Sequence, residues 1–259
     1  MAAVRHSPNA ICQSLVRLGH LCFDDFLLLK PETLDIGHWT SDVVSDWAIA
    51  LNNAPGLFLH LHRLFPDSSF ILQPSSPADT AAAQSRLVHA FAYQLLRAKA
   101  PPLCDALPWQ DWDFSIVARR FKLWQTRFLL AGDGTMVAMY RCRKSAGVYV
   151  VEPDETIARY VERKAVLEKI RRFKLLRASL ERIPLPDRST DLAIVGSILE
   201  KLSPPALAEL ARVAANVLLV ENSPLSPPLD EAPVTAAGFR PDTVAVSALG
   251  PRRCWWKRV

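Results

Sequence analysis

The sequence predicts an α/β protein in which a doubly wound, mainly parallel sheet follows a mostly helical N-terminal domain. In the second half of the chain, short apolar runs alternate with helical patterns, which is the rhythm of strand–helix–strand units in a parallel sheet. In the first half, apolar side chains recur at helical spacing instead. A connector rich in proline and tryptophan, residues 101–113, separates the two patterns. We therefore predict one domain over residues 1–113, connector included, and a second over residues 114–259.

The composition is that of a folded protein and excludes several classes. Half of the 259 residues are hydrophobic and 22% are charged, which is unlike a disordered chain. No apolar run reaches the roughly 20 residues that cross a membrane. Five cysteines without a CxxC pair argue against a disulfide scaffold or zinc ribbon and favour a reducing compartment. We expect a cytoplasmic protein; an organelle matrix is the alternative, because the N terminus carries Arg5 and Arg17 and no acid before Cys22.

The charge is distributed unevenly along the chain. Residues 1–120 carry 9 Lys/Arg against 11 Asp/Glu, which leaves 22 against 15 of the chain totals of 31 and 26 for residues 121–259. The second part therefore has a net charge of +7, and it contains no histidine for acid–base chemistry. A charge of this sign favours polyanionic partners such as nucleic acids.

Two amphipathic patterns predict helices in the first half. The first is capped by Thr40 or Ser41, and the second is predicted to begin at the cap Asp79 and to end before Pro101. Their apolar stripes recur at helical spacing and consist of Val43, Val44, Trp47, Ala48 and Leu51 in the first and Leu87, Phe91 and Leu95 in the second.

Residues 57–64 fit either a short strand or a turn of helix, because apolar residues alternate with His and Arg. On a strand, His60 and His62 would share a face and could bind a metal. No third ligand lies at a suitable spacing, so we favour surface or half-buried histidines and predict no metal site.

A strand–loop–helix–strand unit opens the second half. Residues 127–131 form a buried-strand run, and a loop with Gly132 and Gly134 follows it. The second strand begins at Gly147 and ends at Glu152, 20 residues after Gly132. At this spacing the unit places a carboxylate against a ribose, and the carboxylate accepts hydrogen bonds from two ribose hydroxyls. Glycine in the loop lets the backbone approach the ligand closely.

The alternation continues to the end of the sheet. Further strands are predicted at 174–178, 191–195 and 217–221, with a helix over 155–170 between the second and third. A last helix is capped by Ser203 and is predicted to end where Asn216 adopts left-handed geometry. Tyr160 and Lys164 have the spacing of the catalytic pair of short-chain dehydrogenases, but they come too early in the chain, and we interpret them as a pair on a helix surface.

Residues 121–259 resemble the class I S-adenosylmethionine-dependent methyltransferases, especially the small-molecule type. The resemblance implies the Rossmann-like methyltransferase fold, with a closing β-hairpin after Gly238, and S-adenosylmethionine as the cofactor. Four blocks stand in the family's order, at residues 147–165, 178–202, 206–222 and 238–259.

The resemblance also implies a cofactor site, although it implies no catalytic residue. The glycine loop would line the methionine and ribose, the acid after the second strand would hold the ribose hydroxyls, and later loops would face the adenine and border the transferring methyl group. The implied residues are Gly132, Asp133, Gly134, Glu152, Pro153, Ser179, Leu180, Gly196 and Ser197.

The sequence departs from the family's pattern at several cofactor positions. Leu130 stands where the family has an acid, Met136 replaces the third glycine of the loop, and Ser179 replaces the adenine-side acid. These changes predict weaker binding of S-adenosylmethionine or its loss; the alternative is that the protein binds the cofactor with different contacts. The leading function is a methyltransferase, and the alternative is a non-catalytic binding or scaffold subunit, for example of a ribonucleoprotein.

Two classes of acceptor remain open, with a protein partner as a further possibility. The basic run at residues 161–182, together with the basic C terminus, favours RNA or a ribonucleoprotein, although a solvated helix face explains the run equally well. A small-molecule acceptor would instead bind at the carboxyl ends of the strands, with the proline-rich residues 222–233 as a lid.

Overall fold

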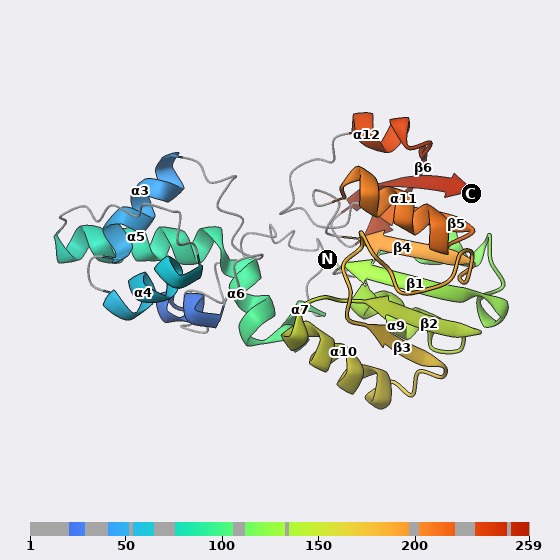
Figure 1. The fold of residues 1–259 in the computed structure, drawn as a ribbon, viewed down its shortest axis with the longest axis horizontal. Coiled ribbons are helices and arrows are strands. Elements are labelled where there is room, and N and C mark those ends of the chain that lie inside the picture. Colours follow the sequence, from blue (N-terminus) through green and yellow to red (C-terminus); the bar gives the residue numbers. More distant parts are fainter. Residues whose placement is uncertain are drawn as a thin grey trace, which may run out of the picture. The chain divides into compact units, whose positions relative to one another are not determined.

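The computed structural model describes residues 21–28, 41–51, 54–64, 76–105, 112–132, 135–196, 202–220, 231–247 and 250–258. Their contacts divide the chain into two compact units, Met1–Pro101 and Pro102–Val259, here called the helical unit and the sheet unit (Figure 1). The division falls inside the predicted connector, and the domain boundary between residues 113 and 114 stays a prediction.

All described elements of the helical unit are helices, as expected. They pack around an aromatic core in which the ring centroids of Phe26 and Trp47 lie 4.7 Å apart and those of Phe26 and Phe91 lie 5.6 Å apart. Phe26 and Trp47 are fully buried. The elements are η1 (Phe23–Leu28), α3 (Ser41–Ala50), α4 (Pro55–Leu64), α5 (Pro77–Ala90) and α6 (Ala92–Lys99).

Two expectations for this unit need correction or completion. The cap of α5 is Ser76, not Asp79: the Ser76 hydroxyl accepts the Asp79 N–H at 3.1 Å and donates to the Asp79 carboxylate at 2.7 Å. Pro77 explains the shift, because proline suits the first helical position and Asp79 then completes a reciprocal cap.

The segment at residues 57–64 is helical and belongs to α4. Residues two apart on a helix do not share a face, so the backbone does not bring His60 and His62 together as a strand would. Within the described part of the chain, no three His, Cys, Asp or Glu side chains are grouped to hold a metal ion.

The sheet unit contains one seven-stranded sheet in the order β3-β2-β1-β4-β5-β7-β6. The first five strands pair in parallel, and β7 pairs antiparallel with both β5 and β6. This is the predicted doubly wound, mainly parallel Rossmann-like sheet with its closing hairpin. The strands are β1 (Arg127–Gly132), β2 (Gly147–Val151), β3 (Phe173–Leu176), β4 (Leu192–Gly196), β5 (Asn216–Val220), β6 (Arg240–Ser247) and β7 (Gly250–Arg258).

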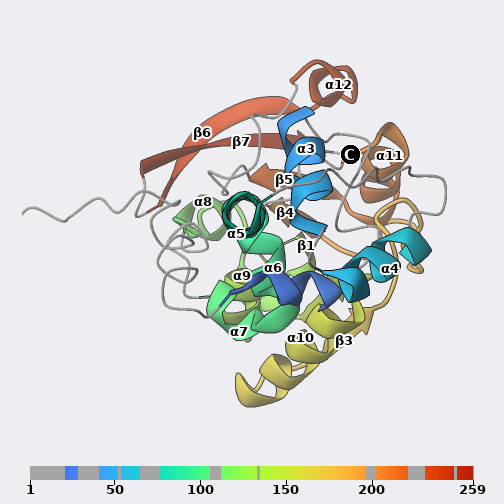
Figure 2. The ribbon, with the colours of Figure 1, turned by 90° about the vertical axis from the view of Figure 1, so that its left-hand side faces the viewer.

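Helices cover both faces of the parallel strands, which explains why these strands are continuous apolar runs. Leu129 and Ala131 of β1 share a buried cluster with Leu207 and Leu210 of α11, whereas α9 packs on the other face (Figure 2). The helices of this unit are α7 (Pro101–Cys104, at the boundary), α8 (Ser115–Ala118), η5 (Leu123–Gln125), α9 (Thr135–Cys142), α10 (Glu155–Leu167), α11 (Pro204–Val213) and α12 (Glu231–Ala236).

The ends of α11 confirm one expectation and overturn another. Ser203 caps the helix, and its hydroxyl accepts the Ala206 N–H at 3.3 Å. Asn216 does not end the helix in left-handed geometry; it begins β5, and its side-chain amide donates to the Asp191 carbonyl at 3.0 Å. The amide therefore ties the start of β5 to the residue before β4. None of the described helices combines the length and the apolar content that crossing a bilayer requires.

Candidate functional site

Two glycines meet where the order of the parallel strands reverses. Gly132 ends β1 and Gly196 ends β4, and the two are direct partners in the ladder. Gly132 has a φ of +81°, a conformation that side chains with a Cβ rarely adopt. In doubly wound sheets, ligands bind at this reversal, outside the carboxyl ends of the strands. Two residues without side chains leave the backbone open to close approach there.

The acid after β2 is held one strand away from this glycine pair. Glu152 is 7% exposed, and its backbone N–H donates to the Leu176 carbonyl of β3 at 3.0 Å. Its carboxylate oxygen Oε1 accepts the N–H of Asp154 at 3.0 Å. The exposed Pro153 lies between these two acids. The carboxylate is thus fixed at the carboxyl edge of the sheet by its own turn.

Asp154 fixes the same turn from the other side. Its carboxylate caps α10 by accepting the N–H groups of Thr156 at 2.7 Å and Ile157 at 3.1 Å. A carboxylate at a helix N-terminus is favourable because it satisfies free N–H groups and faces the positive end of the helix dipole. The start of α10 and Glu152 therefore form one rigid element.

The loop after β3 carries the two predicted adenine-side residues. Ser179 is exposed and its carbonyl accepts the Arg182 N–H at 3.3 Å. Leu180 is half-buried and packs against the cluster shared by β1 and α11. The fold therefore brings Gly132, Glu152, Ser179, Leu180 and Gly196 to one edge of one sheet.

A pair on α11 that the sequence analysis did not identify holds the rest of this loop. The Arg212 guanidinium donates to the carbonyls of Ile183 at 3.0 Å and Leu185 at 2.8 Å. The Glu209 carboxylate accepts the Ile183 N–H at 2.8 Å and also binds Arg212 at 2.7 Å. In the sequence the pair looks like an ordinary helix-surface ion pair, so no local signal marks its role.

Glu209 should make the stability of the protein depend on pH. Its hydrogen bond from Arg212, and next that from the Ile183 N–H, hold its pKa below the usual range although burial opposes them. This stabilisation is present above the ordinary pKa of a glutamate and is lost as pH falls through the lowered folded-state value. We expect Glu209→Gln to cost about 1 kcal/mol at neutral pH and much less in acid.

Thermal unfolding of both proteins at neutral pH and at about pH 3, well below the ordinary glutamate pKa, measures this difference. Glu231→Gln is the matched control, because Glu231 forms only an exposed ion pair with Arg253. A difference between Glu209→Gln and the parent protein that stays constant down to low pH would contradict the assignment.

Three predicted cofactor residues, and one of the positions that depart from the family's pattern, fall outside what the structure describes. Asp133, Gly134 and Ser197 lie outside the described residues, as does the side chain of Met136. Leu130, at the position where the family has an acid, is fully buried within β1. The described part of the site therefore has a buried carboxylate after β2 but an apolar side chain at the first-strand position where the family has an acid.

The predicted surface pair on α10 is wrong for Lys164, which is 8% exposed. The Tyr160 hydroxyl donates to Asp105 Oδ2 at 2.7 Å, and the Lys164 ammonium donates to the same oxygen. Burial, followed by the hydrogen bond and the charge of Asp105, raises the pKa of Tyr160. The phenol therefore stays protonated at neutral pH, and the three side chains anchor the segment after α7 to α10.

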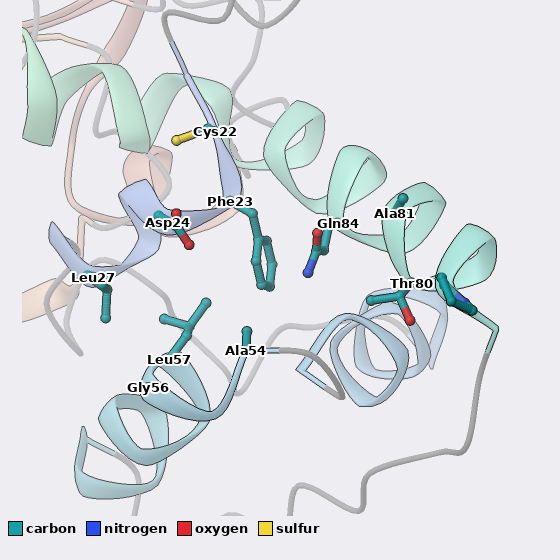
Figure 3. A pocket seen from close by; sticks show the side chains of 11 residues that line it. Cys22, Phe23, Asp24, Leu27, Ala54, Gly56, Leu57, Thr80, Ala81 and Gln84 are labelled. Atoms are coloured by element: carbon teal, nitrogen blue, oxygen red, sulfur yellow. The ribbon is translucent and has the colours of Figure 1, made fainter.

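The helical unit has a hollow of its own, of about 580 Å³, between η1, α4 and α5 (Figure 3). Phe23 and Leu57 supply apolar surface, and Gln84, whose amide donates to the Ala50 carbonyl at 3.1 Å, leaves its oxygen as an acceptor. None of the nine predicted cofactor residues lines it. The lining residues are Cys22, Phe23, Asp24, Leu27, Ala54, Gly56, Leu57, Pro77, Thr80, Ala81 and Gln84.

Residues 129–217, from β1 to the start of β5, match the family model of a methyltransferase domain. No curated protein matches the chain significantly.

Among solved structures, a SAM-dependent methyltransferase from Aquifex aeolicus aligns with 21% identity over 60% of this chain and 96% of its own, at a TM-score of 0.48. Magnesium protoporphyrin IX methyltransferase from Synechocystis PCC 6803 aligns with 14% identity over 85% of this chain and 97% of its own, at a TM-score of 0.45. Residues 129–217 are therefore similar to a methyltransferase domain, and they lie in a sheet with the strand order β3-β2-β1-β4-β5-β7-β6.

Proposed function

We propose that this protein is an S-adenosylmethionine-dependent methyltransferase that binds its cofactor at the carboxyl ends of β1, β2 and β4. One observation carries the proposal: the ladder pair Gly132–Gly196 and the buried carboxylate of Glu152 lie on adjacent strands at the reversal of strand order. A nucleoside needs this combination, because its ribose hydroxyls require an acceptor and its body requires close backbone approach.

The residues present fit most of the cofactor. Glu152 would accept the ribose hydroxyls, and the loop with Ser179 and Leu180 would face the adenine. Gly132 and Gly196 would let the remainder of the molecule lie against the backbone. The family resemblance adds Asp133, Gly134, Pro153 and Ser197 to the proposed site.

The cofactor, when bound, supplies a methyl group that its sulfonium activates for displacement. The task of the protein is then to orient the acceptor in line with that methyl group, and positioning of this kind accounts for much of the rate in such reactions. Glu152, whose carboxylate accepts the Asp154 N–H, and the loop bound by Arg212 would hold the cofactor in place for this alignment, because hydrogen bonds within the protein fix both.

The buried Leu130 favours a second candidate, a scaffold subunit that has lost the cofactor. Without a carboxylate at that position, the amino group of the methionine lacks a charged partner, and a charge-assisted hydrogen bond is worth about 1.5–3 kcal/mol. The proposed enzyme therefore binds its cofactor weakly, whereas the scaffold does not bind it at all.

Calorimetry on the full chain separates the two candidates. We expect heat and a thermal shift with both S-adenosylmethionine and its demethylated product, and neither with ATP at the same concentration. Absence of both signals at millimolar cofactor would leave the scaffold as the function. Transfer of labelled methyl to an RNA fraction or to a small-molecule fraction of a cell extract then identifies the class of acceptor.

A further inference from the structure

The basic run at residues 161–182 does not act as one patch. Lys164 is buried against Asp105, and the guanidinium of Arg177 forms ion pairs at 3.0 Å with both Glu155 and Glu162. The remaining cations of the run lie mainly around the end of α10 and the loop that leads into β3.

These cations lie close together on two loops, one before β2 and one before β3. The backbone N–H of Arg171 donates to the Arg143 carbonyl at 3.4 Å, and the Arg172 guanidinium donates to the Ala146 carbonyl at 3.3 Å. Strand pairing of Val148 with Phe173 keeps the loops side by side. We define the amino-edge surface as these loops and the end of α10, with the residues Arg143, Lys144, Arg163, Val166, Leu167, Lys169, Arg171 and Arg172.

The six cations of this surface differ from others on the same unit. Within the described chain, none of the six has a carboxylate at ion-pair distance, whereas Arg127, Arg159 and Arg212 all do. Glu168 is the only acid between Arg163 and Arg172. Charges of one sign gathered without counter-ions favour a polyanionic partner.

Two of these cations have an unusual backbone conformation. Lys169 and Arg172 both have a φ of 53°, in the left-handed region where glycine is most often found. Lys169 follows the end of α10, where the Ile170 N–H returns to the Ala165 carbonyl at 2.9 Å. A long cationic side chain thus stands at a position where glycine would be less strained.

An exposed aliphatic pair lies among the cations. Val166 and Leu167, in the last turn of α10, are 78% and 80% exposed. Arg163 lies three and four residues earlier and therefore on the same side of the helix. An exposed apolar group rimmed by polar residues commonly marks a protein or membrane contact.

We propose that the amino-edge surface docks on an anionic lipid membrane, with Val166 and Leu167 inserted at the boundary between headgroups and acyl chains. Cations near such a surface are attracted without requiring a fixed partner geometry, and a fluid bilayer needs no pocket to match a protruding pair. RNA would use the cations and the Arg143 guanidinium stacked 3.8 Å from the Tyr140 ring. It would leave Val166 and Leu167 in water.

Docking by this surface is compatible with the proposed function and independent of it. The amino ends of β2 and β3 lie at the opposite edge of the sheet from Glu152 and the glycine pair. The carboxyl edge would therefore face away from the membrane and stay open to ligands.

Flotation of the full chain with vesicles tests the proposal. We expect the protein to float with vesicles that contain phosphatidylglycerol, to remain behind with pure phosphatidylcholine, and to dissociate as salt rises. The double variant Val166→Ser/Leu167→Ser should lower the partition coefficient about ten-fold, because two inserted side chains become polar. Lys169→Gln/Arg171→Gln should lower it as well.

Arg159→Gln is the matched control, because Arg159 is on the same helix but pairs with Glu155. Its partition coefficient should equal that of the parent protein, and unfolding temperatures of all variants verify that they fold. Failure to float with anionic vesicles, or equal flotation of the serine variant, would overturn the proposal. So would tighter binding to polyuridylate than to vesicles, unchanged by the serine substitutions, since the surface would then bind RNA.

Discussion

Replacing Glu152 by alanine is expected to weaken binding of S-adenosylmethionine by about ten- to a hundred-fold, or about 1–3 kcal/mol. The carboxylate is buried at the edge of the sheet, where a ribose would present two hydroxyl groups to it. Alanine leaves those hydroxyls without a charged acceptor in a place that water reaches poorly. Titration calorimetry of the two proteins with the cofactor measures the difference directly.

Two further variants separate binding from folding. Glu152→Gln keeps an acceptor but loses the charge, so its affinity should fall between those of the parent protein and the alanine variant. Glu162→Gln removes an exposed carboxylate of α10 that pairs with Arg177 and should leave affinity unchanged. If Glu152→Ala folds normally and binds the cofactor as tightly as the parent protein, the acid after β2 is structural.

The positions of the central strands could be predicted because strands covered on both faces must be apolar throughout. Residues 127–131 and 191–195 were expected as strands, and β1 and β4 occupy these runs to within one residue at either end. The expected third strand, 174–178, fits less well, since β3 spans Phe173–Leu176 at the end of the sheet and is only partly buried. A half-buried strand has a weaker apolar pattern in the sequence, because some of its side chains face water.

The end of α10 differs from the expectation. The helix was expected to continue to about residue 170. It ends at Leu167, and the chain turns through Lys169 in a left-handed conformation. Glycine at that position would have marked the end in the sequence, but lysine does not.

Gly132 and Glu152 could be proposed as site residues from their spacing along one strand–loop–helix–strand unit, whereas Gly196 was implied only by the family resemblance. The contacts that support the loop after β3 could not be predicted from the sequence. Arg212 reaches the loop at Ile183 and Leu185 from a different helix, and nothing in the sequence near Arg212 indicates these two carbonyls. Partners of this kind become visible only when the fold brings distant segments together.

Lys164 is the clearest example of a residue whose partner could not be predicted from the sequence. Its ion pair also leads to the largest effect on stability that we expect. Asp105→Ala should lower the free energy of unfolding by about 3–5 kcal/mol, because it leaves the ammonium of Lys164 buried without its counter-ion. The loss includes the hydrogen bond from the Tyr160 hydroxyl, which also ends on Asp105. Denaturant unfolding of the full chain measures the change.

A double-mutant cycle distinguishes a buried unpaired charge from simple loss of packing. Lys164→Met keeps most of the apolar stem and removes the charge, so adding it to Asp105→Ala should restore much of the lost stability. Arg159→Ala, which removes a partner of the exposed pair with Glu155, should change stability by no more than about 0.5 kcal/mol. If the double variant is as unstable as Asp105→Ala alone, the ammonium is not the cause. The segment after α7 would then be held to α10 by Tyr160 and by packing.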